Sequence, residues 1–340
     1  MPHPIHALLA PFWAAQIFTG AKSFIDNPLL GSRRLNALGL HAARVRAASA
    51  LTRWRRAGLA SHITPEDRER FERDGVVEIR DFLPLELFQQ LKHELLDFRG
   101  AARETVQGDT ITRRIAIDIE LQKAAPGVRH FVRHPRWRGL ARYVASFNME
   151  PLLYLQSILP HRHDAPPDPQ LQFHADTFHP AMKAWFFLND VSLEQGPFAY
   201  VRGSHRLTPE RLAWEKSRSL TARDGSCRLS GRGSLRIGEE ELEGLGLPQP
   251  TIFAVPANTL IVADTFGFHA RSPASTAEPR IEIWAYSRHN PFRPLRGLNM
   301  GSLPGIAERR IGWRWRLADM ASGLVNQPWR AVGLKRAADD

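Results

Sequence analysis

The chain has 340 residues, of which 43% are hydrophobic, and a single cysteine. This length and apolar content are enough for a large globular core with additions, and one cysteine excludes an internal disulfide and a multi-cysteine zinc site. No run approaches the roughly 18 consecutive apolar residues that a membrane span needs. The apolar stretch 7–18 also lacks the preceding basic residues of a secretory signal. We therefore expect a cytoplasmic protein.

The formal charge of +11 is concentrated at the two ends of the chain. Residues 1–60 carry eight Lys and Arg against one acid, residues 292–340 carry nine against four, and the middle carries 29 against 30. We expect three parts: a basic, aromatic, helical extension over 1–60, a nearly neutral central body over 61–291, and an Arg- and Trp-rich tail over 292–340 packed on that body.

The amino-terminal extension combines aromatic residues with an amphipathic, Arg-rich helix predicted over 38–59. Phe12, Trp13 and Phe18 precede this helix. Aromatic and cationic side chains together suit the headgroup region of an anionic membrane, which would place the protein peripherally on the inner face of a membrane. The alternative is a helical arm packed on the protein's own body. Nucleic acid ranks last as a partner, because no base-reading module accompanies the charge.

The sequence of the central body predicts helices in its first part and mainly short strands in the rest. Thr64 and Pro65 predict a helix start and Gly75 its end; further helices are expected from Pro84, over 135–146 and after Thr208. Strands are predicted over 76–82, 109–118, 152–159, 171–176, 183–189, 198–201, 251–255, 259–263 and 281–286. This pattern predicts an α+β fold with a mainly β core: a double-stranded β-helix, or cupin-like jelly roll, with flanking helices.

A candidate metal site follows from three residues. His174 and Asp176 stand two apart at the end of a predicted strand, so that both project to the same side. His269 follows the apolar strand predicted over 259–263 and can return to the same place. Two histidines and one carboxylate form the ligand set of non-haem Fe(II) oxygenases, which leaves part of the coordination sphere open. Outside this set, His161 and His163 share the spacing, but they lie in a Pro-rich segment.

Two further residues are candidates for the wall of the same site. Arg280 begins the last predicted strand, and an arginine buried there needs an anion, for which a carboxylate is the best geometric match. Trp185 lies on the strand after the His-x-Asp pair and can wall a cofactor pocket, although a core tryptophan is equally ordinary. Asp264 could orient a ligand histidine.

Several motifs, in this order, resemble the phytanoyl-CoA dioxygenase family. They cover residues 64–290 and comprise 73–83, the pair His174 and Asp176, 189–191, 194–198, 201–206, and the spacing from His269 to Arg280. The resemblance implies a double-stranded β-helix that uses Fe(II), 2-oxoglutarate and O2. It assigns iron to His174, Asp176 and His269, and the distal carboxylate of 2-oxoglutarate to Arg280.

The resemblance also assigns Trp185 to the cofactor pocket, and it has two departures. The link from Asp176 to Trp185 is short, and Arg271 stands where the family carries a small hydroxyl residue. Ser272, beside it, is the candidate for that cofactor-binding role. The departures put the namesake substrate in doubt and leave the triad intact.

The resemblance implies a hydroxylase that converts 2-oxoglutarate to succinate and CO2 while it hydroxylates an unactivated C–H bond. Related halogenases carry a small residue in place of the carboxylate ligand, so Asp176 favours hydroxylation. We expect a small organic substrate, which would be lipid-like if the extension contacts a membrane. The alternative is a non-catalytic jelly-roll binding protein at a membrane surface.

Overall fold

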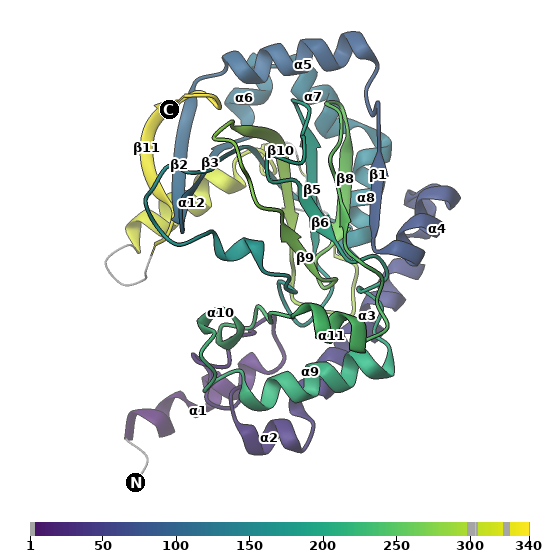
Figure 1. The fold of residues 1–340 in the computed structure, drawn as a ribbon, viewed down its shortest axis with the longest axis vertical. Coiled ribbons are helices and arrows are strands. Elements are labelled where there is room, and N and C mark those ends of the chain that lie inside the picture. The colour runs from purple at the N-terminus through teal and green to yellow at the C-terminus, as the bar shows by residue number, and fades with distance from the viewer. Residues whose placement is uncertain (1–3, 298–302, 304, 322–326, 340) are drawn as a thin grey trace.

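The computed structural model describes residues 4–297, 303, 305–321 and 327–339. Its core is a pair of antiparallel sheets, as the sequence predicts for a double-stranded β-helix (Figure 1). The large sheet has the order β1 (Val76–Ile79), β8 (Leu260–Asp264), β5 (Met182–Phe187), β10 (Arg280–Ser287), β4 (Leu152–Leu159), β3 (Thr110–Ala116), β2 (Gly100–Gln107), β11 (Arg330–Lys335). The small sheet has the order β7 (Thr251–Ile252), β6 (Phe198–Tyr200), β9 (His269–Arg271).

The helices form two groups (Figure 1). One group packs on the outer face of the large sheet: α4 (Pro65–Asp74), α5 (Leu85–Asp97), α6 (Ile119–Ala124), α7 (Pro126–Arg133) and α8 (Pro135–Ala145). The second group lies at one end of the barrel: α1 (Pro4–Gln16), α2 (Arg33–Ala37), α3 (Leu40–Ala57), α9 (Pro209–Thr221), α10 (Arg228–Gly231) and α11 (Glu239–Gly244). The remaining elements are the short 3-10 helices η1 (Ala60–His62) and η2 (Pro169–Leu171), and α12 (Arg310–Met320).

Strand β10 shows how the large sheet separates two environments. Its side chains alternate between the two faces of the sheet. Ile281 and Ile283 join the core beneath the outer helices. Arg280 and Trp284 face the interior of the barrel, where they line a cavity. The outer helices therefore exclude water from one face and leave the other face free to carry polar chemistry.

The predicted strand 171–176 is wrong. Successive backbone N–H groups in this segment bond to three different parts of the chain: His174 to His269, Ala175 to Leu235 and Asp176 to Thr265, at 3.0, 3.0 and 2.9 Å. A strand needs one continuous partner, so the segment forms only isolated bridges. The tail was expected only to pack on the body. Its strand β11 instead joins the large sheet, where it pairs with β2 at the edge.

Two of the arginines of α3, Arg44 and Arg55, are buried. Arg44 donates to the carbonyl oxygens of Ile17, Thr19 and Ala21 at 2.8, 3.0 and 2.7 Å. Arg55 is only 1% exposed. These contacts favour the alternative interpretation of the extension, in which it is a helical arm packed on the protein's own body. None of the helices within the described ranges is both long and apolar enough to cross a membrane.

Replacement of Arg44 by Leu should lower the free energy of unfolding by on the order of 3 kcal/mol, because three carbonyl oxygens lose their donor. Urea unfolding measures the change. The matched control is Arg46→Leu on the exposed side of the same helix, for which a change within about 0.5 kcal/mol is expected. Equal effects of the two substitutions would show that Arg44 does not hold the extension in place.

Candidate metal centre and cofactor pocket

His174, Asp176 and His269 come together at the mouth of the barrel. Within the described ranges they form the one group of three potential metal ligands, with ligand atoms all within 4.8 Å of one another. His174 and His269 exchange two backbone hydrogen bonds, each 3.0 Å long. Their imidazole centroids lie 4.5 Å apart. The backbone pairing thus fixes two residues that are far apart in sequence within reach of one ion.

The outer ring nitrogens set the direction of both imidazoles. Nδ1 of His174 contacts the carbonyl oxygen of Gln172 at 2.7 Å, and Nδ1 of His269 contacts that of Gly267 at 3.0 Å. A proton on each Nδ1 leaves Nε2 as a lone-pair donor, the arrangement found in metal-ligating histidines. Each Nε2 lies 3.7 Å from Oδ1 of Asp176, too far for a hydrogen bond.

The protonation states also suit a metal. Burial lowers the pKa of His269 to about 4 and, with the neighbouring His269, lowers the pKa of His174 well below its usual value. Burial opposes ionisation of Asp176, but Lys183 and the two histidines hold its pKa well below the usual range. At neutral pH all three residues are therefore in the deprotonated forms that bind metals. The buried Nε2 of His269 has no partner among the described residues, as expected of a ligand atom.

Lys183 holds the far side of the carboxylate. Its Nζ lies 2.7 Å from Oδ2 of Asp176, and Lys22 donates to the backbone carbonyl of the same residue. Asp176 therefore presents Oδ1 to the histidines while its other oxygen is neutralised. Lys183 is not among the residues predicted from the sequence, although its place two residues before Trp185 on β5 puts both side chains on the same face.

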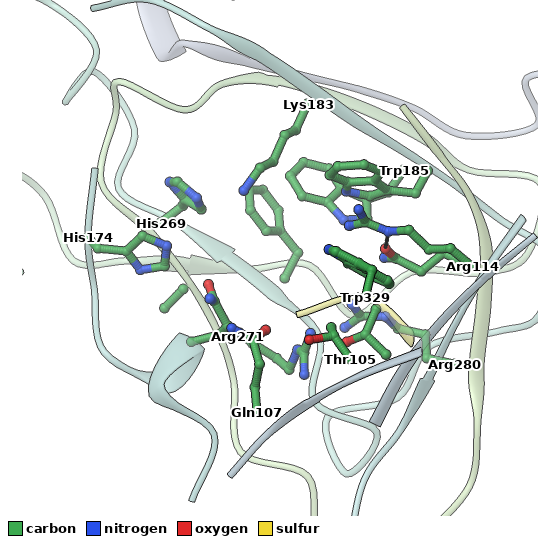
Figure 2. Close-up of a pocket in the computed structure, with 16 residues that line it drawn as sticks. Thr105, Gln107, Arg114, His174, Lys183, Trp185, His269, Arg271, Arg280 and Trp329 are labelled. Atoms are coloured by element: carbon green, nitrogen blue, oxygen red, sulfur yellow. Dashed lines mark hydrogen bonds between the residues drawn. The ribbon is translucent and has the colours of Figure 1, made fainter. Parts of the chain in front are cut away.

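A cavity of about 140 Å³ begins at the two histidines. Its charged lining residues are all cations: Arg114, Lys183, Arg271 and Arg280. Figure 2 shows Lys183 beside the histidines, with Arg114, Trp185 and Arg280 toward the opposite end. A wall of cations beside three neutral or negative metal ligands attracts a small dianion that also chelates the metal.

Arg280 lines this cavity and is already partly paired. Its Nε donates to Glu282 at 2.9 Å and its Nη1 to the carbonyl of Gly196. Glu282 is fully buried and also accepts from Gln156 at 2.7 Å. These contacts fix the guanidinium plane, while Nη2 has no partner among the described residues and is the group left to bind an incoming anion.

Trp185 also lines the cavity, where its ring packs on Phe198 with centroids 4.2 Å apart. Ser272 does not line it, and its backbone N–H bonds to Pro197 at 2.8 Å. The neighbouring Arg271 lines the cavity instead and pairs with Asp168 at 2.5 Å. The structure thus brings Trp185 and Arg280 together with the histidines, and leaves Ser272 outside.

Two residues that line the cavity, Arg114 and Trp329, were not predicted from the sequence. Arg114 on β3 donates to Gln156 at 2.8 Å and stacks 3.7 Å from the ring of Trp284. Trp329, just before β11, covers the other side of the guanidinium at 4.3 Å. Alternation along β3 could have pointed to Arg114. No local signal could have brought Trp329 to the cavity, because its position depends on the pairing of β11 with β2.

The other candidate residues lie apart from the triad. His161 contacts Asp109 at 3.0 Å and is not part of the metal group; neither is the exposed His163. Asp264 does not orient a ligand histidine. It pairs with Arg56 at 2.8 Å and accepts from the backbone N–H of Ala181 at 3.1 Å.

The family comparison agrees with this site. The model of the phytanoyl-CoA dioxygenase family matches residues 71–229. Together with the His-Asp-His group, the match defines the protein as an enzyme of the Fe(II)- and 2-oxoglutarate-dependent oxygenase class. Within that class, residues 71–229 are a phytanoyl-CoA dioxygenase family domain, which confirms the resemblance seen in the motifs. No curated protein has a significantly similar sequence.

Similar solved structures are distant. One is the epimerase SnoN in complex with Fe3+, alpha ketoglutarate and nogalamycin RO, at 21% identity, with 73% of this chain and 91% of that chain covered and a TM-score of 0.43. Another is HygX from Streptomyces hygroscopicus with nickel, 2-oxoglutarate and hygromycin B bound, at 17% identity, 66% and 88% coverage and a TM-score of 0.42. Likenesses this weak say nothing about the substrate of this chain.

Replacement of Glu282 by Gln should destabilise the protein by about 3 kcal/mol, since Arg280 would remain buried without a counter-charge. Chemical denaturation measures the loss. Glu278→Gln, an exposed acid close to the start of the same strand, is the control and should leave stability within about 0.5 kcal/mol of wild type. A neutral result for Glu282→Gln would mean that the ion pair does not hold Arg280.

Proposed function

We propose that this enzyme is a hydroxylase that inserts oxygen into an unactivated C–H bond of a small organic substrate and releases succinate and CO2. The observation that carries the proposal is the carboxylate of Asp176, which faces both histidine Nε2 atoms at 3.7 Å. A carboxylate ligand occupies the position that a halide would need, so the ligand set favours hydroxyl transfer.

The residues present fit Fe(II) and 2-oxoglutarate. His174, Asp176 and His269 would hold the metal, since their ligand atoms are deprotonated, mutually close and turned toward one another. Arg280 would hold the distal carboxylate of the keto acid, and Trp185 would wall the same pocket. When bound, the pair supplies the oxidising chemistry that amino-acid side chains lack. Ser272 is not favoured for cofactor contact, because Arg271 takes the lining position.

The residues of the chain would hold the metal ligands in position and exclude water from the cavity. Lys183 keeps one oxygen of Asp176 away from the metal side. The aromatic rings of Trp185, Phe198 and Trp284 line the cavity and limit its contact with solvent. A small pocket of this kind protects a reactive step from side reactions.

The class of substrate is a separate part of the proposal. A lipid-like molecule remains our proposal because Phe12 and Phe18, at 60% and 70% exposure, lie on the surface of the extension. Arg44 and Arg55 do not add to it, since both side chains are used internally. Contact with an anionic membrane would then depend on the aromatic pair and on exposed arginines such as Arg33 and Arg34.

Replacement of Asp176 by Ala should weaken anaerobic Fe(II) binding by more than about 100-fold and abolish succinate formation in the presence of metabolite or lipid extracts. Calorimetry measures the first effect and chromatography the second. The control is Asp224→Ala, whose carboxylate side chain is 81% exposed and should have no influence. Wild-type metal affinity and turnover in Asp176→Ala would overturn the assignment. A metal site with no turnover on any extract would favour the non-catalytic binding protein.

The double substitution F12S/F18S should reduce flotation of the full-length protein with anionic phosphatidylglycerol vesicles by at least about fivefold, because exposed aromatic side chains supply the interfacial contact. The matched control is L317S/M320S, which removes two exposed apolar side chains of α12, at 63% and 82% exposure. If wild type does not float, or if both doubles float equally, the reason to expect a lipid-like substrate disappears.

A further inference from the structure

A second cavity, of about 630 Å³, lies apart from the metal centre and shares no lining residue with the cavity described above. Its lining residues come from α3, α4, α8 and the loop after β6. The extension contributes much of its wall, through Ser49, Thr52, Arg53, Arg56, Ala57 and Ala60. Its size falls in the range of small-molecule sites, roughly 300–1,000 Å³.

The charges around this cavity do not balance. Four arginines line it, Arg53, Arg56, Arg68 and Arg206, and Glu72 is the one acid among the lining residues. Arg56 is matched by the fully buried Asp264 behind the wall, at 2.8 Å. No carboxylate pairs with the other three arginines within the described ranges. Three unmatched guanidinium groups against the carboxylate of Glu72 leave an excess of about two positive charges, the charge of a phosphate monoester near neutral pH.

The inner wall is held in place before any ligand arrives. Arg56 donates to the carbonyl oxygens of Tyr143 and Val144 at 3.1 and 2.6 Å. The hydroxyl of Tyr143 donates to Glu72 at 2.7 Å, which fixes the acid at one side. His205, only 9% exposed, completes the inner wall, and its Nδ1 has no partner within the described ranges.

The outer wall is free to close on an anion. Arg53, Arg68 and Arg206 are exposed, and each comes from a different element: α3, α4 and the loop after β6. Arg53 contacts Ser49 and Arg206 contacts the carbonyl of Gly203, both neutral groups. A guanidinium presents a planar fork of donors that fits phosphate oxygens in pairs.

We propose that this second cavity binds a small phosphate-bearing molecule. Its phosphate would lie among Arg53, Arg68 and Arg206, and its organic part against the apolar lining residues Phe71 and Leu207. A single carboxylate would neutralise only half of the excess charge, so phosphate is the better match. A soluble phosphate ester and a phospholipid headgroup share this chemistry, and the experiment separates the two sources.

Calorimetry with the full-length protein at about 0.15 M salt should detect saturable, one-to-one binding of glycerol 3-phosphate or inorganic pyrophosphate. The double variant R68Q/R206Q should weaken this binding at least tenfold. The matched control is R70Q/R316Q, which removes two exposed arginines, one on α4 and one on α12, neither of which lines the cavity. Both doubles lose the same net charge, so a general electrostatic effect would weaken binding equally in the two.

Flotation with phosphatidic acid vesicles distinguishes the source of the phosphate. Binding to vesicles that depends on Arg68 and Arg206, without affinity for the soluble probes, assigns the site to a lipid headgroup. Affinity for the soluble probes assigns it to a free phosphate ester. No saturable binding of any probe to wild type, or equal weakening in R68Q/R206Q and R70Q/R316Q, would overturn the proposal. The anaerobic affinity for Fe(II) should be unchanged in both doubles, which shows that the variants are folded.

Discussion

The structure depends on a single pairing of backbone segments at the mouth of the barrel. His174 and His269 exchange two hydrogen bonds of 3.0 Å, and this pairing turns two imidazoles toward one carboxylate. The segment that carries His174 belongs to no continuous strand, because its successive N–H groups bond to three different partners. These three backbone partners, and not a regular strand ladder, hold His174 and Asp176 in place on the same side of the segment.

Buried charge is the second constraint on this fold. Arg280 lies against Glu282, Arg271 against Asp168, and Lys183 against Asp176, at 2.9, 2.5 and 2.7 Å. In the first two pairs the cation faces the cavity and the acid lies behind it, whereas in the third the acid, Asp176, also faces the two histidines. This arrangement lowers the cost of burying the cations and still presents a positive wall to an anionic cofactor. The Arg56–Asp264 pair repeats the same design at the second cavity.

Much of this architecture could be predicted from local sequence. Strand β4 and helix α8 were placed almost to the residue, because β4 is a largely apolar run bounded by Pro151 and Pro160, and Pro135 marks the start of α8. The three potential metal ligands were predicted from the His-x-Asp spacing, the place of His269 after an apolar strand and the family resemblance, although the strand predicted to carry His174 and Asp176 does not form. Strand β2 and helix α7 were missed: the sequence around Arg103 and Glu104 is too polar to suggest a buried strand. Charge pairing between Arg103 and Asp319 and between Arg113 and Glu104 supports that region, and tertiary pairing of this kind leaves no local periodicity.

The extension shows where composition alone misleads. Its arginines predicted a cationic surface, yet burial and hydrogen bonding to carbonyl oxygens use several of them internally. Arginine is suited to this, since one guanidinium satisfies several acceptors at once. The cofactor pocket likewise gained Arg114 and Trp329 from segments whose meeting depends on strand pairing at the edge of the sheet.

The central claim is that three side chains bind one ferrous ion with an open side for 2-oxoglutarate. Visible spectroscopy under anaerobic conditions tests it most directly. Addition of Fe(II) and 2-oxoglutarate to the wild-type protein should give a weak metal-to-ligand charge-transfer band that saturates at one iron per chain and is absent in His269→Ala. A folded wild-type protein that gives no band at saturating Fe(II) and 2-oxoglutarate, or an undiminished band in His269→Ala, would contradict the account.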